Sequence, residues 1–386
     1  MTADQKKRLI PYTLGEKKAE LVLKNARVID VFTKTIRQAD IAIQEGRIVG
    51  VGSYDGVEET DLEGKYVAPG FIDAHVHLES SMVCPSLFAR KVLPCGTTTA
   101  IADPHEIVNV AGIEGLKYML EDSEAADANI YFALPSCVPL DQNDHNGAVF
   151  TARQMASVKD GPRIVGLGEV MNYEAAAAGD AELLEKIELL EPKVIDGHAP
   201  SMTGKKLQAY KLAGVQTDHE CSTWEQALER LQDGFVVQVR EGSAARNLEA
   251  IVTGALEAGI DFSRLVFCTD DLHLDDVAKK GHINNNIKKA IALGADPIQA
   301  IAAATINAAR LYRLDDIGAV APGYRADLAV LENLDPFSVH SVYKDGIPVE
   351  ELLRRRPARL PAGKQITHSV HVPEISEEKL FLPAHR

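Results

Sequence analysis

The pattern of apolar and polar residues along the chain changes near residue 70. Between residues 20 and 68, apolar residues alternate with polar ones in short stretches such as Leu21–Asn25 and Ile41–Ile43, and Glu45-Gly46-Arg47 marks a turn into Ile48–Val51. Such alternation is typical of strands that bury one face. We therefore expect a small β module, which ends where Pro69-Gly70 interrupts the pattern.

From residue 71 onward, short and nearly continuous apolar runs alternate with stretches of helical periodicity. Runs of this kind are typical of parallel strands that helices cover on both faces. Their repetition over about 240 residues favours an α/β fold of the (β/α)8 type, a TIM-like barrel, over an open doubly wound sheet. The eight predicted strands are Phe71–His77, Thr97–Ala102, Asn129–Leu134, Ile164–Glu169, Val194–His198, Val215–His219, Phe235–Arg240 and Leu265–Asp270.

The part of the chain that follows the predicted barrel is expected to return to the first module. Asp296-Pro297 is a suitable start for a last barrel helix, whose apolar face extends to Tyr312. A strand is predicted at 326–331, and both chain ends would then build one small β-sandwich domain. We therefore divide the chain into residues 70–318, the barrel, and residues 1–69 plus 319–386, the small domain and an extended tail.

Composition excludes several classes of protein. The chain has 386 residues with 46% apolar and 25% charged residues, as in ordinary globular proteins. Its net charge of −15 argues against nucleic acid or an anionic membrane as a partner. No apolar run reaches the roughly 20 residues of a membrane span, and the N-terminus has no signal-peptide pattern. Five cysteines without paired spacing predict free thiols and a cytoplasmic protein, and a barrel of this kind is expected to form a homo-oligomer.

The end of the first predicted barrel strand carries two histidines, His75 and His77. Side chains alternate between the faces of a strand, so these two imidazoles point the same way and could bind one metal ion together. His-x-His pairs also occur by chance, and two structural histidines are the alternative interpretation.

Four further residues of ligand type stand at the C-terminal ends of predicted strands. Each alone has a structural explanation: a core histidine, a surface acid or a helix cap. In a barrel, however, these strand ends meet at one rim, where active sites form. Together with the histidine pair they predict a metal site. The four residues are Glu169, His198, His219 and Asp270.

This set of ligands suits two neighbouring divalent ions. His75, His77 and Asp270 would hold one ion, His198 and His219 the other, and Glu169 could bridge them because a carboxylate has two oxygens. Two ions that share a water lower its pKa, and Asp270 could take the released proton. A site with one ion, in which His219 only supports the ligands, is the alternative arrangement.

Several motifs carry a resemblance to known proteins. The segment Pro69–His77 and the return strand at 318–331 resemble the metal-dependent amidohydrolase superfamily. A set of shorter motifs is similar, more narrowly, to the adenine deaminase family. These motifs are His77–Met82, Ala102–Ile107, Gly197–Pro200, Asp218–Cys221, Arg240–Asn247 and Thr269–Asp271.

The resemblance implies a hydrolytic enzyme that converts adenine to hypoxanthine and ammonia with the help of two divalent ions. We expect manganese or iron(II), with zinc as the alternative. It also implies that Glu169 bridges the ions where many superfamily members use a carboxylated lysine. Alternative functions are an amidohydrolase that acts on another amino-purine or a cyclic amide, and a metal-binding scaffold without activity.

Four residues near the predicted rim are candidates for substrate binding. Glu79 follows the first strand, His105 and Glu106 follow the second, and Arg246 follows the seventh. The alternatives are a solvated loop acid for Glu79, a helix cap or support of the ligands for His105 and Glu106, and an ion pair within its loop for Arg246. Asp218 and Glu220, which flank His219, are expected to point away from it.

Two features depart from the family pattern. Members of the adenine deaminase family are usually longer, and residues 366–386 resemble the approach to their further C-terminal domain. The loop Leu140–Gly147 differs from the pattern expected after the third strand.

Overall fold

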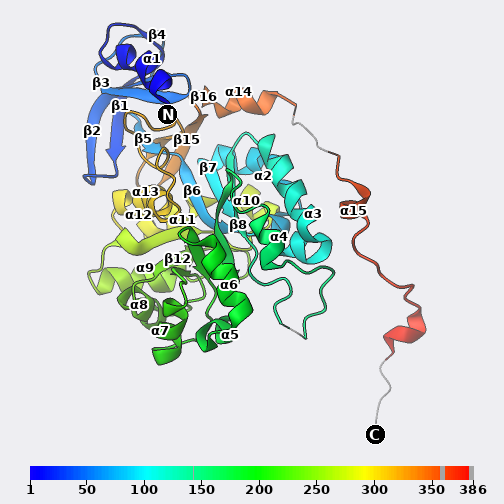
Figure 1. Ribbon diagram of the computed structural model, residues 1–386. Coiled ribbons are helices and arrows are strands. Elements are labelled where there is room, and N and C mark those ends of the chain that lie inside the picture. Colours follow the sequence, from blue (N-terminus) through cyan, green and yellow to red (C-terminus); the bar gives the residue numbers. More distant parts are fainter. Residues whose placement is uncertain (142, 357–360, 382–386) are drawn as a thin grey trace.

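The computed structural model describes residues 1–141, 143–356 and 361–381, and Figure 1 shows a β-rich part beside a barrel that helices surround. Gln142 of the predicted third loop, and residues 357–360 and 382–386 of the predicted tail, lie outside the described residues. Among the described residues, no helix has the length and hydrophobicity that a membrane span requires. All five cysteines are free thiols, as predicted.

The β-rich part is one eight-stranded sheet whose strands come from both sides of the barrel sequence. β14 pairs antiparallel with β5, so that Val330 lies opposite Val67, and the apolar face of the sheet is buried. Positive φ angles at Glu45 and Gly46 form the predicted turn between β2 and β3. The strands are β1 (Ala19–Asp30), β2 (Thr35–Gln44), β3 (Arg47–Gly52), β4 (Gly56–Asp61), β5 (Tyr66–Pro69), β14 (Leu328–Asn333), β15 (Ser338–Lys344) and β16 (Ile347–Pro348).

A strand occupies each of the eight predicted barrel positions. Seven of the runs match closely, whereas β11 is reduced to two residues. All of these strands are nearly fully buried, which explains their continuous apolar sequences. They are β6 (Phe71–Val76), β7 (Thr97–Ala102), β8 (Asn129–Leu134), β9 (Ile164–Val170), β10 (Val194–Gly197), β11 (Thr217–Asp218), β12 (Val236–Arg240) and β13 (Leu265–Cys268).

Two parallel sheets, β6 to β10 and β11 to β13, meet at two seams. At one seam the backbone N–H of Gln216 donates to the carbonyl of Ile195 (2.8 Å). At the other, the N–H of Asp270 donates to the carbonyl of His75 (2.9 Å), and the N–H of His77 donates to the carbonyl of Asp270 (3.1 Å). The strands therefore follow one another in a TIM-like fold.

Helices cover the outside of these strands, as Figure 1 shows. The barrel helices are α2 (Pro85–Val92), α3 (His105–Glu124), α4 (Ala152–Ala156), α5 (Tyr173–Ala178), α6 (Ala181–Leu190), α7 (Gly204–Leu212), α8 (Trp224–Gln232), α9 (Leu248–Glu257), α10 (Leu274–Lys280), α11 (Ile283–Ala292), α12 (Pro297–Ala303) and α13 (Ile306–Leu311). Short 3-10 turns are η1 (Leu78–Ser81), η2 (Leu93–Cys95) and η3 (Phe262–Arg264). Outside the barrel lie α1 (Ala3–Thr13), α14 (Val349–Arg354), α15 (Lys364–Thr367) and η4 (Glu377–Leu380).

The prediction of one continuous last helix is wrong. Asp296 caps its start as expected, accepting hydrogen bonds from two backbone N–H groups, but the helix breaks between α12 and α13. The carbonyl of Ala304 accepts instead from the backbone N–H of Ile72 at 2.7 Å, which ties the break to the first barrel strand. The Thr305 hydroxyl donates to the carbonyl of Ile301 (2.6 Å), a bond that is common where helices bend.

A buried ion pair joins the loops that follow β10 and β11. Arg230 donates from Nε to Oδ2 of Asp218 (2.8 Å) and from a terminal nitrogen to the carbonyl of Ala199 (2.8 Å). Both charged side chains are fully buried. Ala199 and Asp218 are the chain neighbours of His198 and His219, so this pair fixes the backbone that carries both histidines.

Replacing Arg230 tests this role. Arg230→Met leaves the Asp218 carboxylate in the interior without its cation, and we expect the free energy of unfolding in urea to fall by about 3–5 kcal/mol. The matched control is Lys206→Met, which removes an ion pair with Glu174 on the surface and should change stability by less than about 1 kcal/mol. Equal stabilities of the two variants would contradict the assignment.

Candidate metal centre

The six predicted ligands meet at the C-terminal rim of the barrel. One group comes from β6 and from the residues that follow β6 and β13. His75 Nε2 lies 3.2 Å from His77 Nε2, and Oδ1 of Asp270 lies 3.7 Å from the first nitrogen and 3.3 Å from the second. Asp270 has a left-handed backbone (φ 59°), and the hydrogen bonds of the seam hold it there. The closure of the barrel thus places its carboxylate.

The second group contains the histidines that follow β10 and β11. His198 Nδ1 lies 3.3 Å from His219 Nε2. Oε2 of Glu169 lies 2.8 Å from the former nitrogen and 3.1 Å from the latter, whereas Oε1 lies 3.5 Å from His77 Nε2. The two oxygens of Glu169 therefore face the two groups, as a bridging ligand requires.

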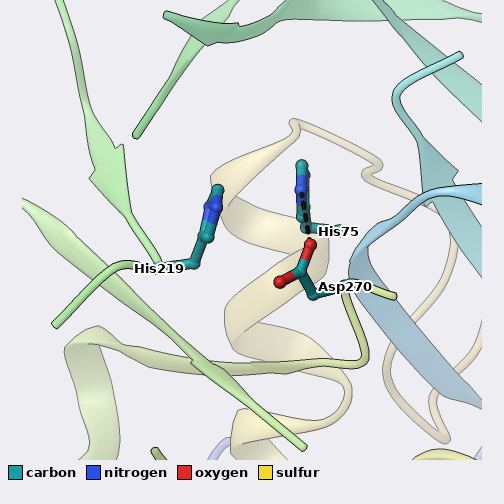
Figure 2. A group of neighbouring side chains, drawn as sticks. All are labelled: His75, His219 and Asp270. Atoms are coloured by element: carbon teal, nitrogen blue, oxygen red, sulfur yellow. Dashed lines mark ion pairs between the residues drawn. The ribbon is translucent and has the colours of Figure 1, made fainter. Parts of the chain in front are cut away.

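His219 also approaches the first group. Figure 2 shows its ring facing that of His75, with the carboxylate of Asp270 beside them, and the two rings stack at 4.6 Å between centroids. His75, His219 and Asp270 offer ligand atoms within 4.8 Å of one another, and so do the sets His75, His77, Glu169 and Glu169, His198, His219. His219 thus lies close to residues of both predicted ligand groups.

The carboxylates of this cluster have lowered pKa values. Burial alone would raise their pKa values, but the opposite effect of neighbouring imidazoles prevails. The hydrogen bond with His77 and the charges of His219 and His75 hold the pKa of Asp270 far below its ordinary value. Hydrogen bonds with His198 and His219 likewise hold the pKa of Glu169 well below its ordinary value.

The imidazoles respond in different directions. Burial, followed by repulsion from the charges of His219 and His77, lowers the pKa of His75 well below its ordinary value. Burial also opposes protonation of His77, yet its hydrogen bond with Asp270 raises its pKa well above the usual range. Against burial, the hydrogen bond and charge of Glu169 raise the pKa of His219 to about 9. The pKa values of His77 and His219 are thus raised by the carboxylates beside them, whereas that of His75 is lowered.

The residues present fit divalent metal ions. Imidazole nitrogens and carboxylate oxygens are ligands of zinc, iron(II) and manganese, and a cation there would compensate the buried carboxylates. The Nδ1 atom of His77 lies 3.0 Å from the carbonyl of Asp103 and can donate to it, which leaves Nε2 free to face an ion. Asp103 also accepts from the backbone N–H of Glu169 (2.9 Å). Asp103, which sequence reasoning did not select, thus supports two ligands.

Three of the four predicted substrate residues lie beside this cluster. His105 Nδ1 is 3.4 Å from Oε1 of Glu169, and Oε2 of Glu106 is 3.7 Å from Nδ1 of His77. Oε1 of Glu79 accepts from the backbone N–H of Ile107 (3.2 Å). Within the described part of the chain, buried atoms of all three side chains have no hydrogen-bond partner, namely Nδ1 of His105, Oε2 of Glu106 and Oε2 of Glu79.

The pKa values of these three residues are shifted, as is typical of functional sites. Burial and the charge of Glu106 raise the pKa of Glu79 to about 7, and burial raises the pKa of Glu106. Against burial, the carboxylate of Asp103, whose Oδ1 lies 3.6 Å from Nδ1 of His105, raises the pKa of His105 to about 9. A cavity of about 740 Å³ opens next to them and is lined by His105, Glu106, Asn109, Val110, Cys137, Leu140, Asp144, His145, Asn146, Gly147, Met171, Ser369, Val370 and His371.

Arg246, the fourth predicted substrate residue, lies in a different cavity. Its guanidinium donates to the carbonyls of Gly242 (2.9 Å) and Ser243 (2.7 Å) and lies 3.6 Å from Glu241. This cavity, about 710 Å³ in volume, is also lined by Lys289. The contacts favour the alternative role, in which Arg246 holds its own loop.

The expectation that Glu220 points away from His219 is wrong. Oε1 of Glu220 lies 3.5 Å from His219 Nε2 and 3.6 Å from His198 Nδ1. The alternation of faces does not apply to it because β11 ends at Asp218. Asp218 itself does turn away, toward Arg230. Sequence reasoning also missed Arg240, although its place at the end of the seventh predicted strand could have indicated a residue of the rim.

Comparison with known proteins places these observations in a family. The model of the Amidohydrolase family matches residues 66–349. The adenine deaminase of Desulfitobacterium hafniense is 50% identical over 376 residues, which are 97% of this chain and 66% of the relative. That of Clostridium acetobutylicum is 44% identical over 378 residues, again 97% of this chain and 66% of the relative. The chain thus spans slightly less than two thirds of the length of these curated relatives.

Solved structures support the fold. A crystal structure of an adenine deaminase has a TM-score of 0.63 at 18% identity and covers 86% of this chain and 99% of its own. A dihydroorotase has a TM-score of 0.63 at 16% identity and covers 86% of this chain and 97% of its own. At such identities the likeness concerns the fold, which is the TIM-like fold predicted from the sequence.

The position of Glu169 leads to a prediction about metal content. Full-length protein that is stripped with a chelator, incubated with Mn²⁺ and dialysed should retain about two ions per chain, and Glu169→Gln should retain about one or none, because both groups lose a shared anionic ligand. Elemental analysis by mass spectrometry gives the count. Glu174→Gln, on the exposed helix after the same strand, is the matched control and should retain the wild-type content. Wild-type metal content in Glu169→Gln would refute the bridging role.

Proposed function

This chain belongs to the amidohydrolase family, and on that basis we propose that it hydrolyses adenine to hypoxanthine and ammonia. The observation that carries the proposal is the placement of Glu169 between two groups of histidines at the rim of the barrel. Similarity to proteins named adenine deaminase over nearly the whole chain supports the choice of substrate.

Two divalent ions are the proposed cofactors, with manganese or iron(II) expected before zinc. His75, His77 and Asp270 would hold one ion, His198 and His219 the other, and Glu169 both. When bound, such ions supply Lewis acidity, which lowers the pKa of water so that hydroxide is available as a nucleophile at neutral pH. His219 lies near both groups, but its Nε2 is 3.1 Å from the carboxylate of Glu169, which is compatible with its assignment to the second ion.

The proposed catalytic role of Asp270 is to accept a proton. Addition of water to C6 of adenine forms a carbon–oxygen bond, and the water must lose a proton as it attacks. The carboxylate of Asp270 faces the site, so it can take that proton and deliver it to the departing amine. Cleavage of the carbon–nitrogen bond then releases ammonia and leaves hypoxanthine.

Glu79, His105 and Glu106 are the proposed contacts of the purine. Their buried atoms, which have no hydrogen-bond partner among the described residues, would otherwise cost desolvation energy, and the N–H groups and ring nitrogens of a purine can donate to them or accept from them. Glu79, with a pKa of about 7, carries a proton on part of the molecules at neutral pH. In that form it can donate a hydrogen bond to a ring nitrogen, which makes C6 more electrophilic.

The remaining proposals concern organisation. We infer a barrel domain of residues 70–318 and a small β-sandwich domain of residues 1–69 plus 319–386, supported by the pairing of β14 with β5. We also infer a cytoplasmic homo-oligomer that binds neither nucleic acid nor membranes, supported by the net charge of −15 and the free cysteines.

A spectroscopic assay of the Mn²⁺-loaded chain with adenine tests the activity. Conversion to hypoxanthine shifts the ultraviolet absorption and releases ammonia. Asp270→Asn keeps the size of the side chain and suits a left-handed backbone, yet it cannot accept the proton, so we expect kcat to fall about 10²–10⁴-fold. Asp296→Asn, at a helix cap where asparagine serves equally well, is the control and should keep wild-type kcat. Turnover of a cyclic amide but not of adenine by the wild type would refute the substrate assignment.

A second substitution separates substrate binding from metal binding. Glu79→Ala removes the proposed hydrogen bond to the purine, and kcat/KM for adenine should fall at least about tenfold. The content of Mn²⁺ should stay at the wild-type level, because Glu79 belongs to neither group of ligands. Unchanged kinetics would place Glu79 outside the substrate site.

A further inference from the structure

Arg240, the last residue of β12, connects two carboxylates of the rim. One terminal nitrogen of its guanidinium donates to Oδ2 of Asp270 (2.8 Å) and to Oε1 of Glu220 (2.6 Å), and the other donates to Oε2 of Glu220 (3.0 Å). Arg240 is 9% exposed. Charge-assisted bonds of this paired geometry are among the strongest and most directional in proteins.

The two oxygens of Asp270 have different partners because of the contact with Arg240. Oδ1 faces the imidazoles of His75 and His77, and Oδ2 is held by the guanidinium. Without Arg240, the carboxylate could rotate about its side-chain bonds, because the seam fixes only its backbone. By holding Oδ2, the guanidinium thus leaves Oδ1 to face the metal centre.

The same guanidinium restrains Glu220. Oε1 of Glu220 lies within 3.6 Å of both His198 Nδ1 and His219 Nε2, close enough for this carboxylate to compete as a ligand. Both of its oxygens, however, accept hydrogen bonds from Arg240. Arg240 therefore acts on both halves of the centre, orienting Asp270 in one and withholding Glu220 from the other.

We propose that Arg240 is a positioning residue that sets the metal affinity of the centre by orienting Asp270 and by keeping Glu220 from pairing with the imidazoles of His198 and His219 in place of an ion. This inference rests on the proposed metal-dependent function but concerns binding of the ions and not turnover. Residues that orient metal ligands commonly contribute 10–100-fold to affinity. An arginine is suited to this task because a lysine cannot reproduce its paired bonds.

The test is a calorimetric titration of the chelator-stripped full-length chain with Mn²⁺. Arg240→Met should weaken binding of at least one ion about 10–100-fold, and Arg240→Lys should lie between this variant and the wild type. The matched control is Arg264→Met, at the opposite end of the neighbouring strands, where the guanidinium bonds to the carbonyl of Phe235. This control should keep the wild-type affinities.

Circular dichroism and thermal melting of each variant verify its fold. If Arg240→Met does not fold, Arg240→Lys carries the test, with an expected loss of affinity for Mn²⁺ of about tenfold. Wild-type dissociation constants in a folded Arg240 variant overturn the proposal. A wild-type chain that binds Mn²⁺ but leaves adenine unchanged refutes the proposed substrate alone, and the titrations of the variants still decide the role of Arg240.

Discussion

The buried carboxylate of Glu169 is the interaction on which the rim depends. An ionised carboxylate that leaves water loses several kcal/mol of solvation unless partners compensate it. Glu169 is only 2% exposed, and its partners His77, His198 and His219 come from three other strand ends. His219 belongs to the other sheet and His77 to the far edge of the same sheet, so both reach Glu169 only when the barrel is closed. The geometry of the candidate metal centre and the closure of the barrel are therefore two aspects of one structure.

The sequence predicted most of the barrel strands and the clustering of the candidate ligands, for a physical reason. Strands buried on both faces leave continuous apolar runs, which can be read without knowledge of tertiary contacts. Residues at their C-terminal ends must then lie on one rim, independently of the conformation of the loops. That rule found Glu169, His198, His219 and Asp270, and the structure brings all four together with His75 and His77.

What sequence reasoning missed depends on long-range contacts. The position of Glu220 is set by Arg240, a partner on another strand, and the alternation of strand faces ends two residues before it. The break between α12 and α13 follows a hydrogen bond from Ile72 to Ala304, across most of the barrel sequence. No local pattern contains such information, because apolar periodicity continues through the break. For Arg246 the sequence left two roles open, and its hydrogen bonds to Gly242 and Ser243 lie within its own loop.

The sheet built from both sides of the barrel has a consequence for synthesis of the chain. β5 emerges from the ribosome early, but its antiparallel neighbour β14 is made only after every barrel strand. Until then one edge of β5 has unpaired N–H and carbonyl groups, which can recruit strands from other chains. In the nascent protein, residues 66–69 thus lack their antiparallel neighbour for as long as the barrel is being translated.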